Sequence, residues 1–323
     1  MTSRHVLPTD YHVSSDDPNK KIRIMKNISS ILVAVLCLVF PTSQALAQMT
    51  FAKDGLRYHV LDGQNVSVCY DDEDSLFLSG RVVIPEQVVN PADEIAYKVV
   101  AVADTAFKGC DLIDVLVLPA SLQRFGAHAI DHCFNMGSYE VASGSQFFKT
   151  IDGVLFSADG TTLVSCPTGK GGEYVFPKGV KTMAPAAFST CKNFSKVELP
   201  EGLKDVPDYA FYECWGLVDV KFPASLETIG AYAFDGTIIQ FLDFGNRLKS
   251  IGNHAFDRSS MVECICRSAT PAHMGNDVFG NDMNYTRLYV PAEAVSKYKR
   301  SAWSIFPTIY PGTRTRRWMG SYR

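Results

Sequence analysis

The sequence has neither the long apolar runs of a membrane protein nor the basic surface of a nucleic-acid-binding one. Its most apolar stretch, Ile28–Phe40, is 13 residues long, whereas a helix that spans a bilayer needs about 20. Residues 48–311 carry 22 basic and 31 acidic side chains, so the body of the chain repels the phosphates of DNA and RNA. We therefore expect neither an integral membrane protein nor a nucleic-acid-binding one.

The sequence also lacks the short motifs that mark common enzymes. The segment Thr168–Gly172 lacks a glycine at the upstream position that a phosphate-binding loop requires. The chain contains neither Gly-x-Ser-x-Gly nor His-Glu-x-x-His. We expect a protein that is not an enzyme and needs no cofactor.

The N-terminal region has the parts of a secretory signal. The apolar run is preceded by four basic side chains, Lys20, Lys21, Arg23 and Lys26. Ala45-Leu46-Ala47 follows it as a small-residue cleavage site, so we predict cleavage between Ala47 and Gln48. The protein is then exported, either secreted or held at the cell surface or in the periplasm of a bacterium. Residues 1–24 have two interpretations. Either translation starts at Met25 and these residues are not made, or they are a genuine extension of the signal's basic region.

Hydrophobic residues make up 46% of the chain, which is ample for a packed core, and they recur with a fixed period. Each repeat carries the dipeptide Ala-Phe or a close variant: Ala106-Phe107, Ala129-Ile130, Ala187-Phe188, Ala210-Phe211, Ala233-Phe234, Ala255-Phe256 and Val278-Phe279. The spacing is 22 or 23 residues except between Ala129 and Ala187, where 58 residues equal one period and an insertion of 35. Such a period is typical of solenoid proteins.

Each repeat predicts one strand and one return segment. Several strands end at a proline, which cannot donate a ladder hydrogen bond: Pro119, Pro200, Pro223 and Pro291. No single repeat can bury its apolar side chains alone. Successive repeats must therefore stack strand beside strand, about 4.8 Å apart. We expect a repeat solenoid with a parallel β-sheet. The Ala-Phe segments should be short helical turns or irregular returns whose phenylalanine rings stack into a spine.

Three segments resemble the BspA-like leucine-rich repeats of bacterial surface and secreted proteins: Leu199–Leu203, Phe222–Phe234 and Leu248–Phe256. Tyr97–Val102 resembles the first strand of that family, and Leu288–Pro291 resembles the beginning of its C-terminal cap. The resemblance extends over about residues 50–311. It implies a leucine-rich-repeat-like, right-handed β-α superhelix with its strands on the inner face, exported and used for binding.

The repeat also predicts the domain organisation. We expect an N-terminal extension and signal peptide (1–47), a β-rich N-terminal cap (48–97), the solenoid (98–287), a C-terminal cap (288–311) and a basic disordered tail (312–323). The insertion, at about residues 138–172, contains the turn Ser157–Gly160 between two apolar runs. This pattern predicts a β-hairpin, which we expect to project from the stack. An enzyme built on the insertion would have only four titratable groups, Asp152, Asp159, Lys170 and Glu173.

The cysteines follow the repeat rather than the pattern of a disulfide framework. Four of them come three residues after the Phe or Ile of the dipeptide: Cys110, Cys133, Cys191 and Cys214. This position indicates a column of buried free thiols, with disulfides between repeats as the alternative. Cys264 and Cys266 lie eight and ten residues after Phe256, at positions that we expect on the open face of the sheet.

Two groups of residues have the spacing of metal ligands, but neither predicts a metal site. His128 and His132 are four residues apart, as in some zinc sites, yet His128 occupies a repeat column that also holds Tyr209 and indicates a solvated position. The acidic run Asp71–Asp74 lacks the glycine and the distal glutamate of a calcium-binding loop. We interpret it as a solvated hairpin turn and expect no metal.

Alternation within the strands leaves one face of the sheet open to a partner. We expect that face to carry Val115, Val117, Lys196, Glu198, Asp219, Lys221, Phe241, Asp243, Arg287 and Tyr289. Aromatic and arginine side chains among alternating charges are typical of interface hot spots. The alternative for Val115, Val117 and Phe241 is that loops cover them. We predict a monomer that binds a protein or glycan partner through this face, in adhesion or host contact. The alternative function is a spacer or assembly component of a bacterial envelope complex.

Overall fold

The computed structural model describes residues 50–70, 78–280 and 285–312. The chain divides into two units, Met1–Gln48 and Met49–Arg323, and every described residue belongs to the second. The predicted signal, its cleavage site and the acidic run at 71–74 therefore lie outside the described residues, as does the tail after Gly312. In the described part of the chain, no helix has the length and apolar character needed to cross a membrane.

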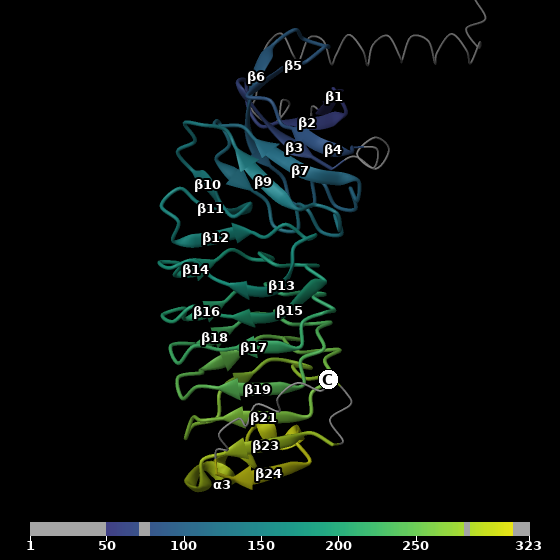
Figure 1. The fold of residues 1–323 in the computed structure, drawn as a ribbon. Coiled ribbons are helices and arrows are strands. Elements are labelled where there is room, and N and C mark those ends of the chain that lie inside the picture. Colours follow the sequence, from purple (N-terminus) through teal and green to yellow (C-terminus); the bar gives the residue numbers. More distant parts are fainter. Residues whose placement is uncertain (1–49, 71–77, 281–284, 313–323) are drawn as a thin grey trace, which may run out of the picture. The chain divides into compact units, whose positions relative to one another are not determined.

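Parallel strands stack along one side of the molecule and form what we call the front ladder (Figure 1). Its strands are β4 (Gly80–Val83), β7 (Ile113–Leu118) and β9 (Ser138–Val141), then β13 (Gly171–Val175), β15 (Asn193–Glu198) and β17 (Asp219–Lys221), then β19 (Phe241–Phe244), β21 (Glu263–Cys266), β23 (Arg287–Val290) and β24 (Thr308–Pro311). Every pair within these three sheets is parallel. The predicted parallel solenoid is confirmed.

Shorter strands form a second parallel ladder, the return ladder, at the side where the front strands end (Figure 1). It consists of β6 (Ala96–Val102) with β8 (Arg124–Phe125), β12 (Thr162–Ser165) with β14 (Thr182–Met183), and β16 (Asp205–Val206), β18 (Thr228–Ile229), β20 (Ser250–Ile251) and β22 (His273–Met274). A typical turn of the solenoid passes from a front strand through a return strand to an Ala-Phe segment.

The Ala-Phe segments are irregular turns and not helices, so the expected β-α character of the fold is wrong in its helical part. Each turn contains two left-handed residues, for example Tyr209 (φ 57°) and Glu213 (φ 53°). The amide of Phe211 donates to the carbonyl of Ala233 in the next turn, at 2.7 Å, where a helix would bond within itself. Helical segments of the described chain are confined to the C-terminal region: η2 (Ala292–Ala294), α3 (Val295–Tyr298) and η3 (Ala302–Ile305).

The phenylalanines of the Ala-Phe segments stack along the core, which confirms the predicted spine. The ring centroids of Phe188 and Phe211, of Phe211 and Phe234, and of Phe234 and Phe256 lie 4.9, 5.0 and 5.1 Å apart. Phe279 continues the column, and Trp303 and Phe306 pack against its ring at 5.9 and 5.2 Å. The C-terminal segment thus covers the end of the spine with aromatic side chains.

The N-terminal strands form an antiparallel meander that joins the return ladder. β1 (Thr50–Lys53) pairs with β2 (Leu56–Val60), β2 pairs with β3 (Asn65–Cys69), and β3 pairs in parallel with β6. β5 (Gln87–Val89) lies antiparallel on β6. These strands continue the sheet that β6 and β8 form.

The insertion is built into the stack and does not project from it. The predicted hairpin exists, because β11 (Val154–Ser157) pairs antiparallel with β12 and with β10 (Phe148–Ile151). However, β12 also pairs in parallel with β14 of the next turn. Val154, Phe156 and Leu163 belong to the same buried core as the phenylalanine spine. The expectation of a projecting hairpin is therefore wrong, because this hairpin needs the stack to bury its apolar side chains.

Candidate binding surface

The strand register places the predicted surface residues in two outward rows of the front ladder. Lys196 lies opposite Asp219, and Glu198 lies opposite Lys221. Further along the ladder, Phe241, Glu263 and Arg287 share one row, while Asp243, Ile265 and Tyr289 share the other. The side chains between these rows, such as Val197 and Leu242, point into the core.

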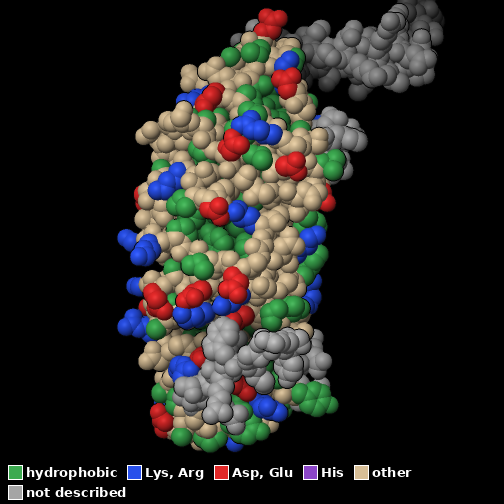
Figure 2. Space-filling view, in the orientation of Figure 1, with side chains coloured by type: hydrophobic (Ala, Val, Ile, Leu, Met, Phe, Trp, Pro, Cys, Tyr) green, Lys and Arg blue, Asp and Glu red, His purple; other side chains and the backbone are tan. Residues whose placement is uncertain are grey.

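Most charged side chains of these rows hold a partner on a neighbouring turn of the solenoid. Lys196 Nζ lies 3.4 Å from Glu173, Lys221 pairs with Glu198, and Asp243 accepts two hydrogen bonds from Arg267, at 2.8 and 2.7 Å. Figure 2, which views the side of the front strands, shows acidic and basic side chains next to one another. Surface ion pairs of this kind add little stability, so their main effect is to leave the face with little net charge.

Val115 and Val117 are covered by an ion pair rather than by loops. Arg81 on β4 lies opposite Val115, and Glu140 on β9 lies opposite Val117. Arg81 and Glu140 meet at 2.6 Å, so their bond crosses the middle strand β7. Both valines are half-buried beneath it. They contribute less accessible apolar surface than the sequence predicted.

Two predictions about this face are wrong at its C-terminal end. Cys264 aligns with Leu288, and Cys264 and Cys266 both belong to the core, so it is Ile265 that lies in the outward row. Tyr289 lies in the outward row but is only 6% exposed, because Tyr310 of β24 stacks on its ring with centroids 5.2 Å apart. The last strand thus closes the open face at Tyr289.

Apolar side chains remain accessible in the N-terminal and middle parts of the face. Val175 on β13 is 73% exposed, and Val83 on β4 is 52% exposed. Phe241 on β19 is half-buried. The accessible apolar surface is therefore centred on β13 and β19 and is flanked by paired charges.

The titratable groups of the insertion do not form a catalytic cluster. Lys170 Nζ binds Asp152 at 3.0 Å, whereas Glu173 pairs with Lys196 instead. Asp159 closes the hairpin turn, and hydrogen bonds from Ser157 and Thr161 lower its pKa to about 2. Each carboxylate is engaged in a separate structural contact.

His128 and His132 lie in different environments and do not converge on a metal. The Nδ1 of His128 lies 2.7 Å from the buried Asp131, and the ring packs edge-on against Tyr209. His132 packs against Phe134. Both histidines have left-handed backbones, so the column of His128 is a position of the turn and not the freely solvated one that we expected. No group of three or more candidate ligands occurs in the described ranges.

The cysteines are free thiols in the structure, as predicted. Seven of the eight described cysteines are buried, the exception being Cys69. The thiols of Cys133 and Cys214 donate to the carbonyls of Phe107 and Phe188, at 2.9 and 3.0 Å. Burial raises the pKa of Cys191 and of Cys214 well above the usual range, so these thiols stay protonated and unreactive.

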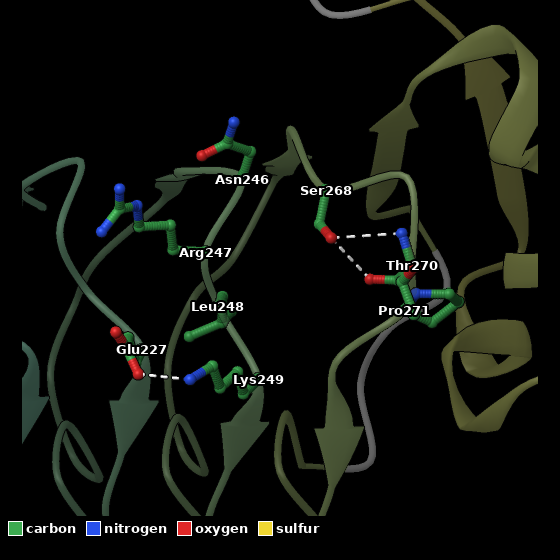
Figure 3. A pocket seen from close by; sticks show the side chains of 8 residues that line it. All are labelled: Glu227, Asn246, Arg247, Leu248, Lys249, Ser268, Thr270 and Pro271. Atoms are coloured by element: carbon green, nitrogen blue, oxygen red, sulfur yellow. Dashed lines mark hydrogen bonds and ion pairs between the residues drawn. The ribbon is translucent and has the colours of Figure 1, made fainter.

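One pocket was not foreseen from the sequence. It has a volume of about 570 Å³ and lies where three front strands pass into the return ladder (Figure 3). Three successive turns line it, with Glu227, Asn246, Arg247, Leu248, Lys249, Ser268, Thr270 and Pro271. These residues occupy return segments of different sequence, so no repeated motif marks the pocket.

The comparisons with known proteins agree with the repeat. The sequence profile of the BspA-type leucine-rich repeat region matches residues 94–176 and 181–304, in six copies. No curated protein matches the chain.

Solved structures that match this chain include the pneumococcal vaccine antigen PcpA, at 15% identity over 82% of this chain and 99% of that one, with a TM-score of 0.46. A leucine-rich repeat protein of Bacteroides ovatus is 17% identical over 81% of this chain and 76% of that one, with a TM-score of 0.39. A leucine-rich repeat protein of T. pallidum is 24% identical over 58% of this chain and 89% of that one, with a TM-score of 0.36.

Proposed function

Since the chain belongs to the BspA-type leucine-rich repeat family, we propose that it is an exported, non-catalytic protein that binds a protein or glycan partner through the open face of its front ladder. The observation that carries this proposal is the accessible apolar surface around Val175 and Phe241, set among charges that neutralise one another. Apolar side chains on an open sheet contribute nothing to the core and are typical of interfaces.

Export rests on the basic segment, apolar run and small-residue site that precede Gln48. The expected mature protein begins at Gln48 and resides at the cell surface, in the periplasm or in the medium. Mass spectrometry of the extracellular protein tests this expectation. An intact N-terminus at Met1 or Met25 on the extracellular protein would contradict it.

The binding face is tested by truncating the exposed apolar side chains once a partner has been isolated from host and bacterial extracts. The double variant Val175→Ser, Phe241→Ala removes accessible apolar surface without touching the core spine. We expect it to weaken binding by about 2 kcal/mol, roughly 30-fold in Kd, with an unchanged melting temperature.

Trp215→Ala serves as the matched control, because Trp215 is 48% exposed but lies on the Ala-Phe side of the solenoid. It should leave the affinity unchanged. If Trp215→Ala weakened binding and the double variant did not, the partner would dock on the side of the Ala-Phe turns.

A further inference from the structure

The pocket of the return ladder has two walls of different chemistry (Figure 3). Arg247 and Lys249 extend toward the turn that contributes Glu227, and this side forms a charged wall. Ser268, Thr270 and Pro271 form the opposite wall, which carries no charge. The buried side chain of Leu248 lies between the two walls and supplies an apolar floor.

The charged wall has an excess of positive charge. Glu227 is its single carboxylate, and Lys249 Nζ binds it at 2.5 Å. This hydrogen bond lowers the pKa of Glu227, and the charges of Lys249, Lys204 and Arg247 lower it further, so the carboxylate is ionised and neutralises Lys249. Arg247 forms no ion pair with a carboxylate of the described residues, so this wall keeps a positive charge in excess. The pocket therefore attracts an anion.

Arg247 differs from the arginines that link neighbouring turns. Arg258 and Arg267 hold Asp235 and Asp243 in two-point contacts, and Arg81 holds Glu140. Arg247, by contrast, makes no hydrogen bond or ion pair with any residue in the described ranges. Its planar guanidinium can therefore offer two parallel N–H donors to a carboxylate from outside the chain.

The uncharged wall offers groups that suit hydroxyls. The Oγ of Ser268 accepts from the amide of Thr270 at 3.1 Å and donates to its carbonyl at 2.7 Å, which fixes the turn. The hydroxyl of Thr270 and the side-chain amide of Asn246 are exposed, and neither makes a hydrogen bond within the described chain. They can donate to, and accept from, the hydroxyl groups of a ligand.

We propose that this pocket binds a sugar acid, a pyranose that carries a carboxylate. The carboxylate lies on the guanidinium of Arg247. The ring covers Leu248 and Pro271 with its C–H face, and its hydroxyls meet Asn246 and Thr270. The volume of about 570 Å³ accommodates one or two sugar rings. This site goes beyond the proposed function, because it lies off the open face and its failure would leave docking on that face unaffected.

Calorimetric titration of the purified full chain at low salt tests the assignment with three probes. Methyl glucuronide carries both the sugar ring and the carboxylate, methyl glucoside lacks the carboxylate, and acetate lacks the ring. We expect the glucuronide to bind with a Kd near the millimolar range, and the other two to bind about tenfold more weakly or not at all. Arg247→Ala should weaken glucuronide binding about tenfold.

Arg300→Ala is the matched control, because Arg300 is an exposed arginine outside the pocket, and it should bind the glucuronide as the wild type does. Arg247→Lys keeps the charge but loses the two parallel N–H donors of the guanidinium, so its affinity for the glucuronide should lie between those of the wild type and Arg247→Ala. Acetate binding as tightly as the glucuronide would reveal a general anion site and overturn the proposal. Equal binding of the glucoside, no saturable binding, or an unchanged affinity in Arg247→Ala would also overturn it.

Discussion

The regular turns, residues 186–279, and the insertion, about residues 138–172, fill one continuous core by different means. In the regular turns, phenylalanine rings of successive repeats lie almost parallel, with interplanar angles of 4° to 16° from Phe188 to Phe256. At the insertion the column ends. Phe188 instead meets Tyr174 edge-on, with centroids 5.0 Å apart and the ring planes at 72°.

This difference shows that each turn of the solenoid must fill its part of the core with apolar side chains, but need not repeat the same sequence. The antiparallel hairpin β11–β12 supplies Val154, Phe156 and Leu163 to its layer, all almost fully buried. The parallel pairing of β12 with β14 then returns the chain to the regular geometry. A different local topology is tolerated because packing in a core depends on volume and contact rather than on sequence identity.

The largest expected effect comes from truncating one buried ring in each region. Phe234 belongs to the regular spine and Phe156 to the insertion, and both are fully buried. Either substitution by alanine should lower the free energy of unfolding by about 3–5 kcal/mol, because transfer and cavity terms add. Chemical denaturation measures both losses.

Phe147→Ala controls for the insertion, because Phe147 is exposed there, and we expect a change within about 0.5 kcal/mol. If Phe156→Ala were as mild as this control, the insertion would fold independently of the stack. The comparison of the two regions would then fail.

A smaller effect is expected at Gly230, where the regular turns approach closely. A Cβ at this position would lie 2.5 Å from the amide nitrogen of Asp208 and 2.7 Å from the carbonyl carbon of Pro207. Gly230→Ala should cost about 1–3 kcal/mol of stability, because backbone of the preceding turn would have to move. Gly63→Ala, whose Cβ would meet nothing within 4 Å, is the control. Equal melting temperatures for the two variants would show that the turns have room to separate.

The smallest effect concerns single buried thiols of the regular turns. Burial raises the pKa of Cys191 and of Cys214, which lie in successive regular turns. The unfolded chain, with thiol pKa values of about 8.5, loses these protons first as the pH rises. Stability is therefore complete below about pH 8.5 and falls above it, by up to about 1.4 kcal/mol per pH unit for each thiol.

Denaturation under reducing conditions between pH 7 and 10 measures this slope. Cys214→Ala and Cys191→Ala should each flatten it by the same amount, since both thiols are fully buried. A slope unchanged by either substitution would mean that the thiols are accessible to solvent.

The period of the Ala-Phe dipeptide was sufficient to predict the parallel front ladder, the aromatic spine and the free thiols, but it did not predict the strands of the return ladder. At β21 the period predicted the wrong inward-facing residues. The reason is that the segment from Phe256 to Cys264 is one residue shorter than the segment from Phe279 to Leu288, with which it aligns. Cysteine and isoleucine are both apolar, so the sequence Glu263–Cys266 does not itself reveal which side chains face inward. A slip of one residue exchanges the two faces of a strand.

The position of the insertion was missed for a different reason. The turn at Asp159-Gly160 identified the hairpin, but a turn motif says nothing about what the hairpin packs against. The continuous apolar run Val154–Phe156 could have indicated a strand that is buried on both faces, because a strand with one solvated face would alternate apolar and polar residues. The left-handed backbones of Tyr209 and Tyr232 had no such signal, because tyrosine rarely adopts that conformation.

The most direct test of the account is to locate the partner on the solenoid in intact cells. A photo-crosslinking amino acid is placed either at Val175, on the open face of the front ladder, or at Trp215, on the side of the Ala-Phe turns. We predict a crosslinked partner from position 175 and none from position 215. A partner captured from position 215 but not from position 175 would contradict binding through the open face.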